Sequence, residues 1–160
     1  MSEKYLPRPM APADVDQAFA LVQLIAPNVT LDRWRNHFAE VCGLDAKPPP
    51  RKGMEVLEGP GGYFHGLFAY HPAADLTLGR TLRVEDFVVL ALFDRLAAAR
   101  AMTRRMEQIA RELECRAVTV HYPPDHPRHG SDQDLRQFLL AQGHMPWFQG
   151  YCKTLPESHQ

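Results

Sequence analysis

Residues 82–92 read LRVEDFVVLAL, an apolar run rich in the β-branched and aromatic residues that favour strands. A short basic turn follows, and then an amphipathic segment in which Ala98, Met102 and Met106 recur at helical spacing. A second strand is predicted at 116–122, RAVTVHY. A turn from a strand into a helix presents unbonded backbone N–H groups and the positive end of the helix dipole, which together suit a phosphate. We therefore expect the function of the chain to lie at this turn.

Helix caps, turn residues and periodicity predict the elements on either side of this core. Before the long strand they are an extended piece at 5–10, helices between Ala11 and Pro27 and between Thr30 and Gly43, and an exposed loop at 47–53. Strands follow at 54–58 and 63–70, joined by the hairpin link 59–62, and a turn near Gly79 leads into the long strand at 81–92. After the strand at 116–122 come a helix from Ser131 or Asp132 to Gly143 and a terminal strand at 147–155.

Composition limits the kind of protein. With 160 residues and 45% hydrophobic content, the chain has material for one core, so we expect a single domain over residues 1–160. The formal net charge of −1 provides no overall attraction for nucleic acid or an anionic membrane, so neither is an expected partner. Cys42, Cys115 and Cys152 are odd in number and far apart, as reduced thiols of a cytoplasmic protein would be. The N-terminus lacks a basic start followed by an apolar run, and the chain has no apolar run of about 18 residues, so we expect neither export nor membrane insertion.

The chain resembles the GNAT family of N-acetyltransferases in three respects. These are the order of its elements, the opening segment RPMAPAD at 8–14, and the segment FLLAQGH at 138–144 before a terminal strand. The resemblance spans nearly the whole chain. It implies an α/β fold of the mixed α+β kind, with a mostly antiparallel, twisted sheet flanked by helices on both faces. It also implies that acetyl-CoA is the co-substrate, that it lies between the fourth and fifth strands, and that its acetyl group passes to a primary amine of a small molecule or a peptide.

In that family, the fourth strand ends at a segment Arg/Gln-x-x-Gly-x-Gly/Ala, whose backbone amides hold the pyrophosphate. The matching segment here, LFDRLAAARAM at 92–102, has alanines where glycines are usual, and the pattern can start at residue 94, 95 or 96. The resemblance also implies that the two strands splay and free a backbone N–H near Val88 or Val89 to polarise the thioester. The candidate cofactor-binding residues are Val88, Val89, Arg95, Ala97, Ala98, Ala99, Arg100 and Ala101.

Asp94 acts against phosphate binding in this segment. As a helix N-cap it would accept hydrogen bonds from the same amides and would repel an anion. Arg95, Arg100, Arg104 and Arg105 act in the opposite direction, because their guanidinium groups are strong phosphate donors.

Amine acetylation needs a base for the ammonium proton and an acid for the departing thiolate. The family often places a glutamate on the fourth strand as base, and the resemblance implies that role for Glu85 or Asp86; because neighbours on a strand point to opposite faces, only one should face the cleft. The family's usual acid is a tyrosine that Leu139 replaces here, so the resemblance leaves Tyr122 as the candidate acid, with His121 and Tyr151 as alternatives.

Three further expectations complete the hypothesis. The histidines and aspartate at 121, 125, 126 and 129 are separated by prolines and lack a fixed ligand spacing, so we predict no metal site there. The terminal strand would allow pairing across a homodimer. Loss of both the glycines and the tyrosine leaves a second functional hypothesis, a catalytically idle module of the same fold that binds an acyl-CoA or a partner protein.

Overall fold

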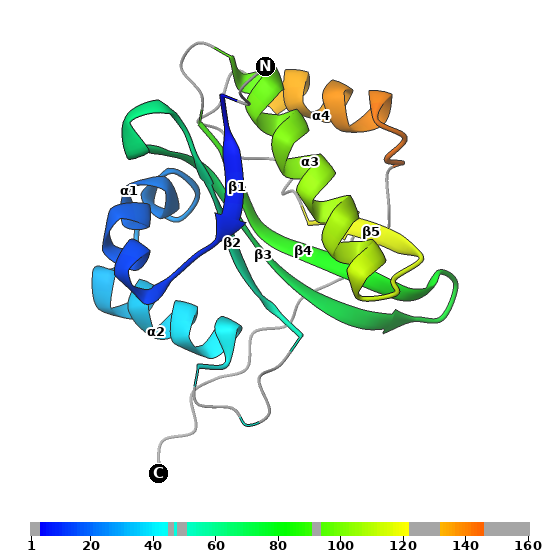
Figure 1. Cartoon of the computed structure of the whole chain (residues 1–160), viewed down its shortest axis with the longest axis horizontal. Helices are drawn as coiled ribbons and strands as arrows, with labels where there is room; N and C mark the ends of the chain where they lie inside the picture. Colours follow the sequence, from blue (N-terminus) through cyan, green and yellow to red (C-terminus); the bar gives the residue numbers. More distant parts are fainter. Residues whose placement is uncertain (1–3, 45–46, 48–50, 91–93, 122–131, 146–160) are drawn as a thin grey trace.

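The computed structural model describes residues 4–44, 47, 51–90, 94–121 and 132–145, which form one five-stranded twisted sheet between two layers of helices (Figure 1). The strands are β1 (Leu6–Pro9), β2 (Gly53–Glu58), β3 (Phe64–Asp75), β4 (Gly79–Val89) and β5 (Ala117–Val120). The helices are α1 (Val15–Ile25), α2 (Leu31–Cys42), α3 (Arg95–Glu112) and α4 (Asp132–Ala141), with short 3₁₀ turns at Pro12–Asp14 and Pro60–Gly62.

The sheet follows the order of the chain, β1-β2-β3-β4-β5. Neighbouring strands are antiparallel except for β4 and β5, which run parallel because α3 carries the chain back between them. Helices α1 and α2 cover one face, and α3 and α4 cover the other (Figure 1). The predicted fold class, a mostly antiparallel mixed sheet with helices on both faces, is confirmed.

Most element boundaries agree with the sequence, and the differences come from strand pairing. β3 continues five residues beyond the predicted end at residue 70, because it pairs with β4 as far as the turn at Asp75 and Gly79. Gly53, expected in a loop, opposes Tyr70 as the first residue of β2. The predicted terminal strand at 147–155 lies outside the described residues.

Helix α2 shows how local signals set an element. The Thr30 hydroxyl accepts a hydrogen bond from the Arg33 backbone N–H at 3.2 Å, and Gly43 follows the helix in the left-handed conformation at φ 57°. Both capping roles were predicted from residue type, and both are confirmed.

Each face of the sheet has its own apolar core. Trp34, Phe38 and Leu67 are among the buried residues under α1 and α2, whereas Phe68 and Met102 belong to the cluster under α3 and α4. The close approach of α3 requires Gly66 on β3, since a Cβ there would lie 2.7 Å from the Met102 sulfur and 2.8 Å from the Val88 carbonyl oxygen. The sheet is therefore fixed from both sides at β3 and β4.

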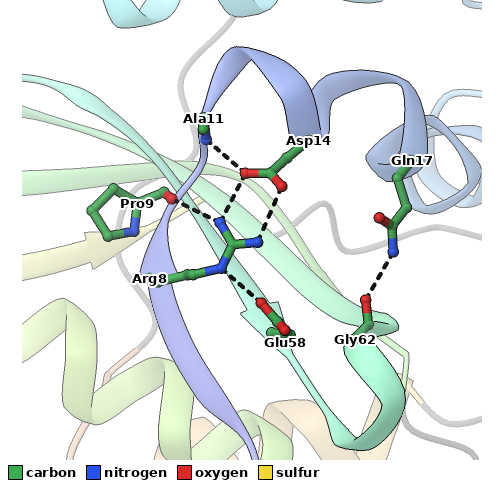
Figure 2. A network of polar contacts seen from close by, with 7 residues as sticks. All are labelled: Arg8, Pro9, Ala11, Asp14, Gln17, Glu58 and Gly62. Atoms are coloured by element: carbon green, nitrogen blue, oxygen red, sulfur yellow. Dashed lines mark hydrogen bonds and ion pairs between the residues drawn. The ribbon is translucent and has the colours of Figure 1, made fainter.

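The segment 8–14 that carries part of the family resemblance has a structural role. The Arg8 guanidinium donates to both carboxylate oxygens of Asp14, at 2.8 and 3.0 Å, and to Glu58 at 2.7 Å (Figure 2). Asp14 also accepts from the Ala11 backbone N–H at 2.8 Å. Arg8 thereby joins β1 to β2 and to the start of α1, and its hydrogen bonds lower the pKa of the Asp14 carboxyl.

Within the described part of the chain, no helix is both long enough and apolar enough to cross a lipid bilayer.

Candidate functional site

Strands β4 and β5 pair over only the first part of β4 in the described chain. The parallel register runs from Thr81 opposite Ala117 to Val84 opposite Val120, and the His121 backbone N–H still donates to the Val84 carbonyl oxygen at 2.8 Å. Beyond that point β4 continues to Val89, and the described pairing of this part is with β3 alone. Among the described residues, the β5-side edge of the second half of β4 has no strand partner, and this is the stretch where the resemblance implies the thioester.

Val88 and Val89 differ in which edge of β4 their N–H groups face. Leu90 donates its backbone N–H to His65 at 2.6 Å, toward β3. Along an antiparallel ladder, hydrogen-bonded and non-hydrogen-bonded residue pairs alternate. Leu90 and His65 form a hydrogen-bonded pair, so Val88 and Leu67 form the next one, and the N–H of Val89 between them faces the β5 side. Of the two predicted donors to the thioester, the ladder therefore favours Val89.

A β-bulge at Asp86 changes the direction of the side chains along β4. Asp86 has a positive φ of 53°, unusual for a residue with a side chain, and the β3–β4 register shifts at this point. Val84 and Phe87 both join the core on the α3 side, so Glu85 and Asp86 between them both lie toward the α2 side. The expectation that only one of the two carboxylates faces a given side was wrong, because the extra residue of the bulge breaks the alternation.

The side chain of Asp86 contacts α2. Its carboxylate lies 2.7 Å from the Nε2 atom of His37, and this hydrogen bond is the largest cause of a raised His37 pKa. Glu40 and Glu85 add to the rise through their charges, against the opposing effect of partial burial. The His37 ring is supported by the buried Trp34, whose ring centroid is 6.1 Å away and whose Nε1 donates to the Val15 carbonyl oxygen. The result is an oriented imidazole in acidic surroundings.

The N-terminus of α3 is capped by Asp94. Its carboxylate accepts from the Ala97 backbone N–H at 3.1 Å, and the Ala98 N–H donates to the Asp94 carbonyl oxygen at 3.2 Å. The competition that the sequence predicted between a cap and a phosphate is thus present, since the carboxylate uses one of the amides at this helix end.

The start of α3 at Arg95 limits which of the predicted cofactor residues can act. From Ala98 onward, backbone N–H groups are used within the helix, so Ala98, Ala99, Arg100 and Ala101 are not available as amide donors. Ala98 and Ala99 are also fully buried in the core under α3. The alanine-rich segment forms the packed first turns of a helix, and at its start the Ala97 amide already donates to the Asp94 carboxylate.

The arginines of α3 have separate roles. Arg105 donates from Nε and from a terminal nitrogen to the two carboxylate oxygens of Glu55, each at 3.0 Å, and Glu55 is only 1% exposed. This pair joins α3 to β2, so Arg105 is not a phosphate ligand as the sequence suggested. Arg100 and Arg104 are exposed one turn apart on the outer face of α3.

The candidate acids are only partly within the described structure. Leu139 is buried with Phe138 in the core, so the position of the family tyrosine holds a packing residue. His121 is exposed at the end of β5, beside the point where β4 and β5 stop pairing. Tyr122 and Tyr151 lie outside the described residues, as do the loop residues at 125, 126 and 129 considered for a metal. Among the residues that the structure describes, no three His, Cys, Asp or Glu side chains form a metal-binding group.

A cavity of about 810 Å³ lies elsewhere, between the second half of α3, β5 and α4. Ala110, Val118 and Leu139 form part of its apolar wall, and Met145 borders it. Of the predicted catalytic and cofactor-binding residues that the structure describes, none lines this cavity.

Sequence reasoning missed His37. It lies on the exposed side of an ordinary amphipathic helix, 49 residues before Asp86, and no local pattern connects the two. The contact exists because the bulge turns Asp86 toward α2.

No protein-family model matches this sequence, and no curated protein sequence matches it. Solved structures do. Glucosamine-6-phosphate N-acetyltransferase from Arabidopsis thaliana has a TM-score of 0.66 at 13% identity, covering 96% of this chain and 100% of that one. A GNAT family acetyltransferase from Staphylococcus aureus has a TM-score of 0.66 at 13% identity, with coverage of 95% and 99%. AAC(6')-Iy, in complex with the bisubstrate analogue CoA-S-monomethyl-acetylneamine, has a TM-score of 0.67 at 15% identity, with coverage of 92% and 99%. The chain therefore has the fold of the GNAT acetyltransferases.

Proposed function

We propose that this protein is an acetyltransferase that uses acetyl-CoA and acetylates a primary amine of a small molecule or a peptide. The observation that carries the proposal is that, among the described residues, β4 pairs with β5 only as far as Val84, while the N–H of Val89 faces the β5 side. An amide in that position can donate to the thioester carbonyl and stabilise the negative charge that develops on its oxygen.

The two sides of β4 suit the two substrates. On the α3 side, the helix N-terminus and the exposed Arg100 and Arg104 provide a dipole and positive charges for the phosphates of the donor. On the α2 side, Glu85, Asp86 and Glu40 provide negative charge that attracts an ammonium group. The similar fold of AAC(6')-Iy, solved with CoA joined to acetylneamine, supports an amine acceptor.

The catalytic assignments remain proposals. Glu85 and Asp86 are the strand carboxylates on the acceptor side, and Tyr122 is the proposed acid for the thiolate. Arg95 and Ala97, at the start of α3, and Val89 are the proposed donor contacts.

The idle module is the second candidate, and two observations favour it. Asp94 already caps α3, and Leu139 occupies the position of the family tyrosine as a core residue. Such a protein would bind acyl-CoA or another protein without transferring the acyl group.

Two measurements separate these functions. Thermal melting with acetyl-CoA at a hundredfold excess over Kd should stabilise the native state by about 2.7 kcal/mol, which for a domain of this size raises the melting midpoint by roughly 5–10 °C. Release of free CoA thiol should then depend on an added primary amine, tested with a diamine, an amino sugar and a lysine peptide.

Stabilisation with no thiol release from any amine would favour the idle module. The absence of any melting shift at millimolar acetyl-CoA would contradict the acetyltransferase and would favour an idle module that binds another protein.

A further inference from the structure

The contact between His37 and Asp86 defines the state of the imidazole. The Nε2 atom lies 2.7 Å from the Asp86 carboxylate, so a neutral ring carries its proton there and donates it to Asp86. In that tautomer Nδ1 has an unprotonated lone pair. The described residues place no hydrogen bond on Nδ1, which leaves it able to accept a proton from a bound molecule.

The position of this pair fits the reaction. Asp86 lies two residues past Val84, the last residue of β4 with a described β5 partner, and a strand rises about 3.3 Å per residue, so the pair is about 7 Å along β4 from that point. The His37 side chain is 45% exposed and that of Asp86 35%, so a substrate can reach them from solvent. Trp34 is 2% exposed, and its ring centroid lies 6.1 Å from that of His37.

We propose that His37 is the general base of the acetyl transfer and that Asp86 positions it, with Nδ1 taking the proton of the acceptor ammonium. This proposal rests on the proposed acetyltransferase function and names a residue of α2, in addition to the strand carboxylates, as the group that moves the proton.

The chemical step balances without a further reagent. Nδ1 removes one proton from the ammonium, and the neutral amine attacks the thioester carbonyl carbon, forming the C–N bond and an oxyanion. The C–S bond then breaks, the second amine proton passes to the departing sulfur, and the products are the amide and CoA thiol. His37 finally returns its proton to solvent. The Nε2 proton stays on His37 throughout, and the Asp86 carboxylate that accepts its hydrogen bond stabilises the imidazolium.

The surroundings of His37 predict how the rate depends on pH. The charged groups acting on the ring are Asp86 and Glu85 from β4 and Glu40 from its own helix, and all three are negative. Each favours the imidazolium, so the neutral, active form should appear only as the pH rises above the ordinary histidine range. kcat/KM should therefore increase through the His37 titration.

The test compares His37→Gln, Asp86→Asn and Glu85→Gln with wild type. His71→Gln is the matched control, because it makes the same substitution at a histidine on β3. Amine-dependent thiol release is measured across roughly pH 6 to pH 9, around the ordinary histidine pKa. We expect His37→Gln to lower kcat by about 10²–10⁴-fold and to abolish the rise with pH, while the KM for acetyl-CoA stays unchanged. Asp86→Asn should move the rise to lower pH, because the hydrogen bond that raises the pKa of His37 is weakened.

Two readouts separate this proposal from the function it rests on. The melting shift with acetyl-CoA must persist in every variant, which shows that each is folded and binds the donor. In wild type, the imidazole titration of His37 by NMR must coincide with the kinetic one. The role of His37 would be overturned, and the acetyltransferase left intact, if His37→Gln kept the wild-type kcat and pH profile or if only Glu85→Gln lost most of its kcat. A wild-type protein that neither binds acetyl-CoA nor releases thiol would overturn both the role of His37 and the proposed function.

Discussion

Asp94 is the residue at which stability and donor binding oppose each other. Its carboxylate stabilises α3 by accepting the Ala97 N–H, and the same carboxylate places a negative charge at the helix end where phosphates would lie. In the family pattern glycines open this segment, whereas here the alanines start a regular helix at Arg95. Any pyrophosphate must therefore compete with Asp94 for the amides.

Removal of the Asp94 charge should strengthen acetyl-CoA binding. Asp94→Asn keeps a good N-cap, so we expect little change in stability and a several-fold lower Kd, since a charge at a helix N-terminus is worth about 0.3–1 kcal/mol. Asp94→Ala should also lower the Kd but should cost about 0.5–2 kcal/mol of stability. Calorimetric titration and urea unfolding measure the two effects.

Thr30→Ala is the control, because it removes the equivalent cap from α2 and should destabilise by a similar amount with no change in the Kd. An unchanged Kd in both Asp94 variants would mean that the phosphates do not bind at the start of α3.

At the scale of elements, the sequence predicted what local chemistry controls. Thr30 and Gly43 set the ends of α2, and the glycines between β2 and β3 set the hairpin, because capping and positive φ depend on residue type. The bulge at Asp86 could not be predicted in this way. It depends on how β4 pairs with β3 while both faces of the sheet are packed, and the residues around it read as a continuous strand.

The pair Arg105 and Glu55 should hold α3 on the sheet. Because Glu55 is buried, Glu55→Gln leaves an uncompensated guanidinium and should cost up to about 3–5 kcal/mol, although the Arg105 side chain is 20% exposed and can reach water in part. The double variant Glu55→Leu with Arg105→Met should recover most of that loss, since an apolar pair of similar volume replaces the ion pair. Urea unfolding of all three proteins gives the values.

Glu107→Gln serves as the matched control on the same helix. Its pair with Arg111 is exposed, and removing it should cost no more than about 0.5 kcal/mol. If Glu55→Gln destabilised the protein as little as Glu107→Gln, the buried pair would not stabilise the packing of α3 against β2.

For the whole molecule, β4 is the meeting point of two layers. The α3 layer brings a helix N-terminus and arginines to one side, and the α2 layer brings His37 and acidic groups to the other. The order of elements predicted this arrangement, because the chain order and the sheet order coincide. Contacts between layers, such as His37 with Asp86 or Arg105 with Glu55, join residues 49 and 50 positions apart, and only the packed structure shows them.

Hydrogen exchange can test whether the donor lies along the opened part of β4. The hydrogen-bond pattern of the β3–β4 pair directs the Val88 N–H toward β3 and the Val89 N–H toward the β5 side. Acetyl-CoA should therefore slow exchange at Val89 and change exchange at Val88 little. The comparison is made by NMR with and without saturating acetyl-CoA, on the same sample. Val56 in the middle of β2 is the control, because it is paired on both edges and buried under α1 and α2. Equal slowing at all three amides would indicate global stabilisation by a ligand bound elsewhere, since only a donor seated against the β5-side edge of β4 distinguishes two neighbouring residues.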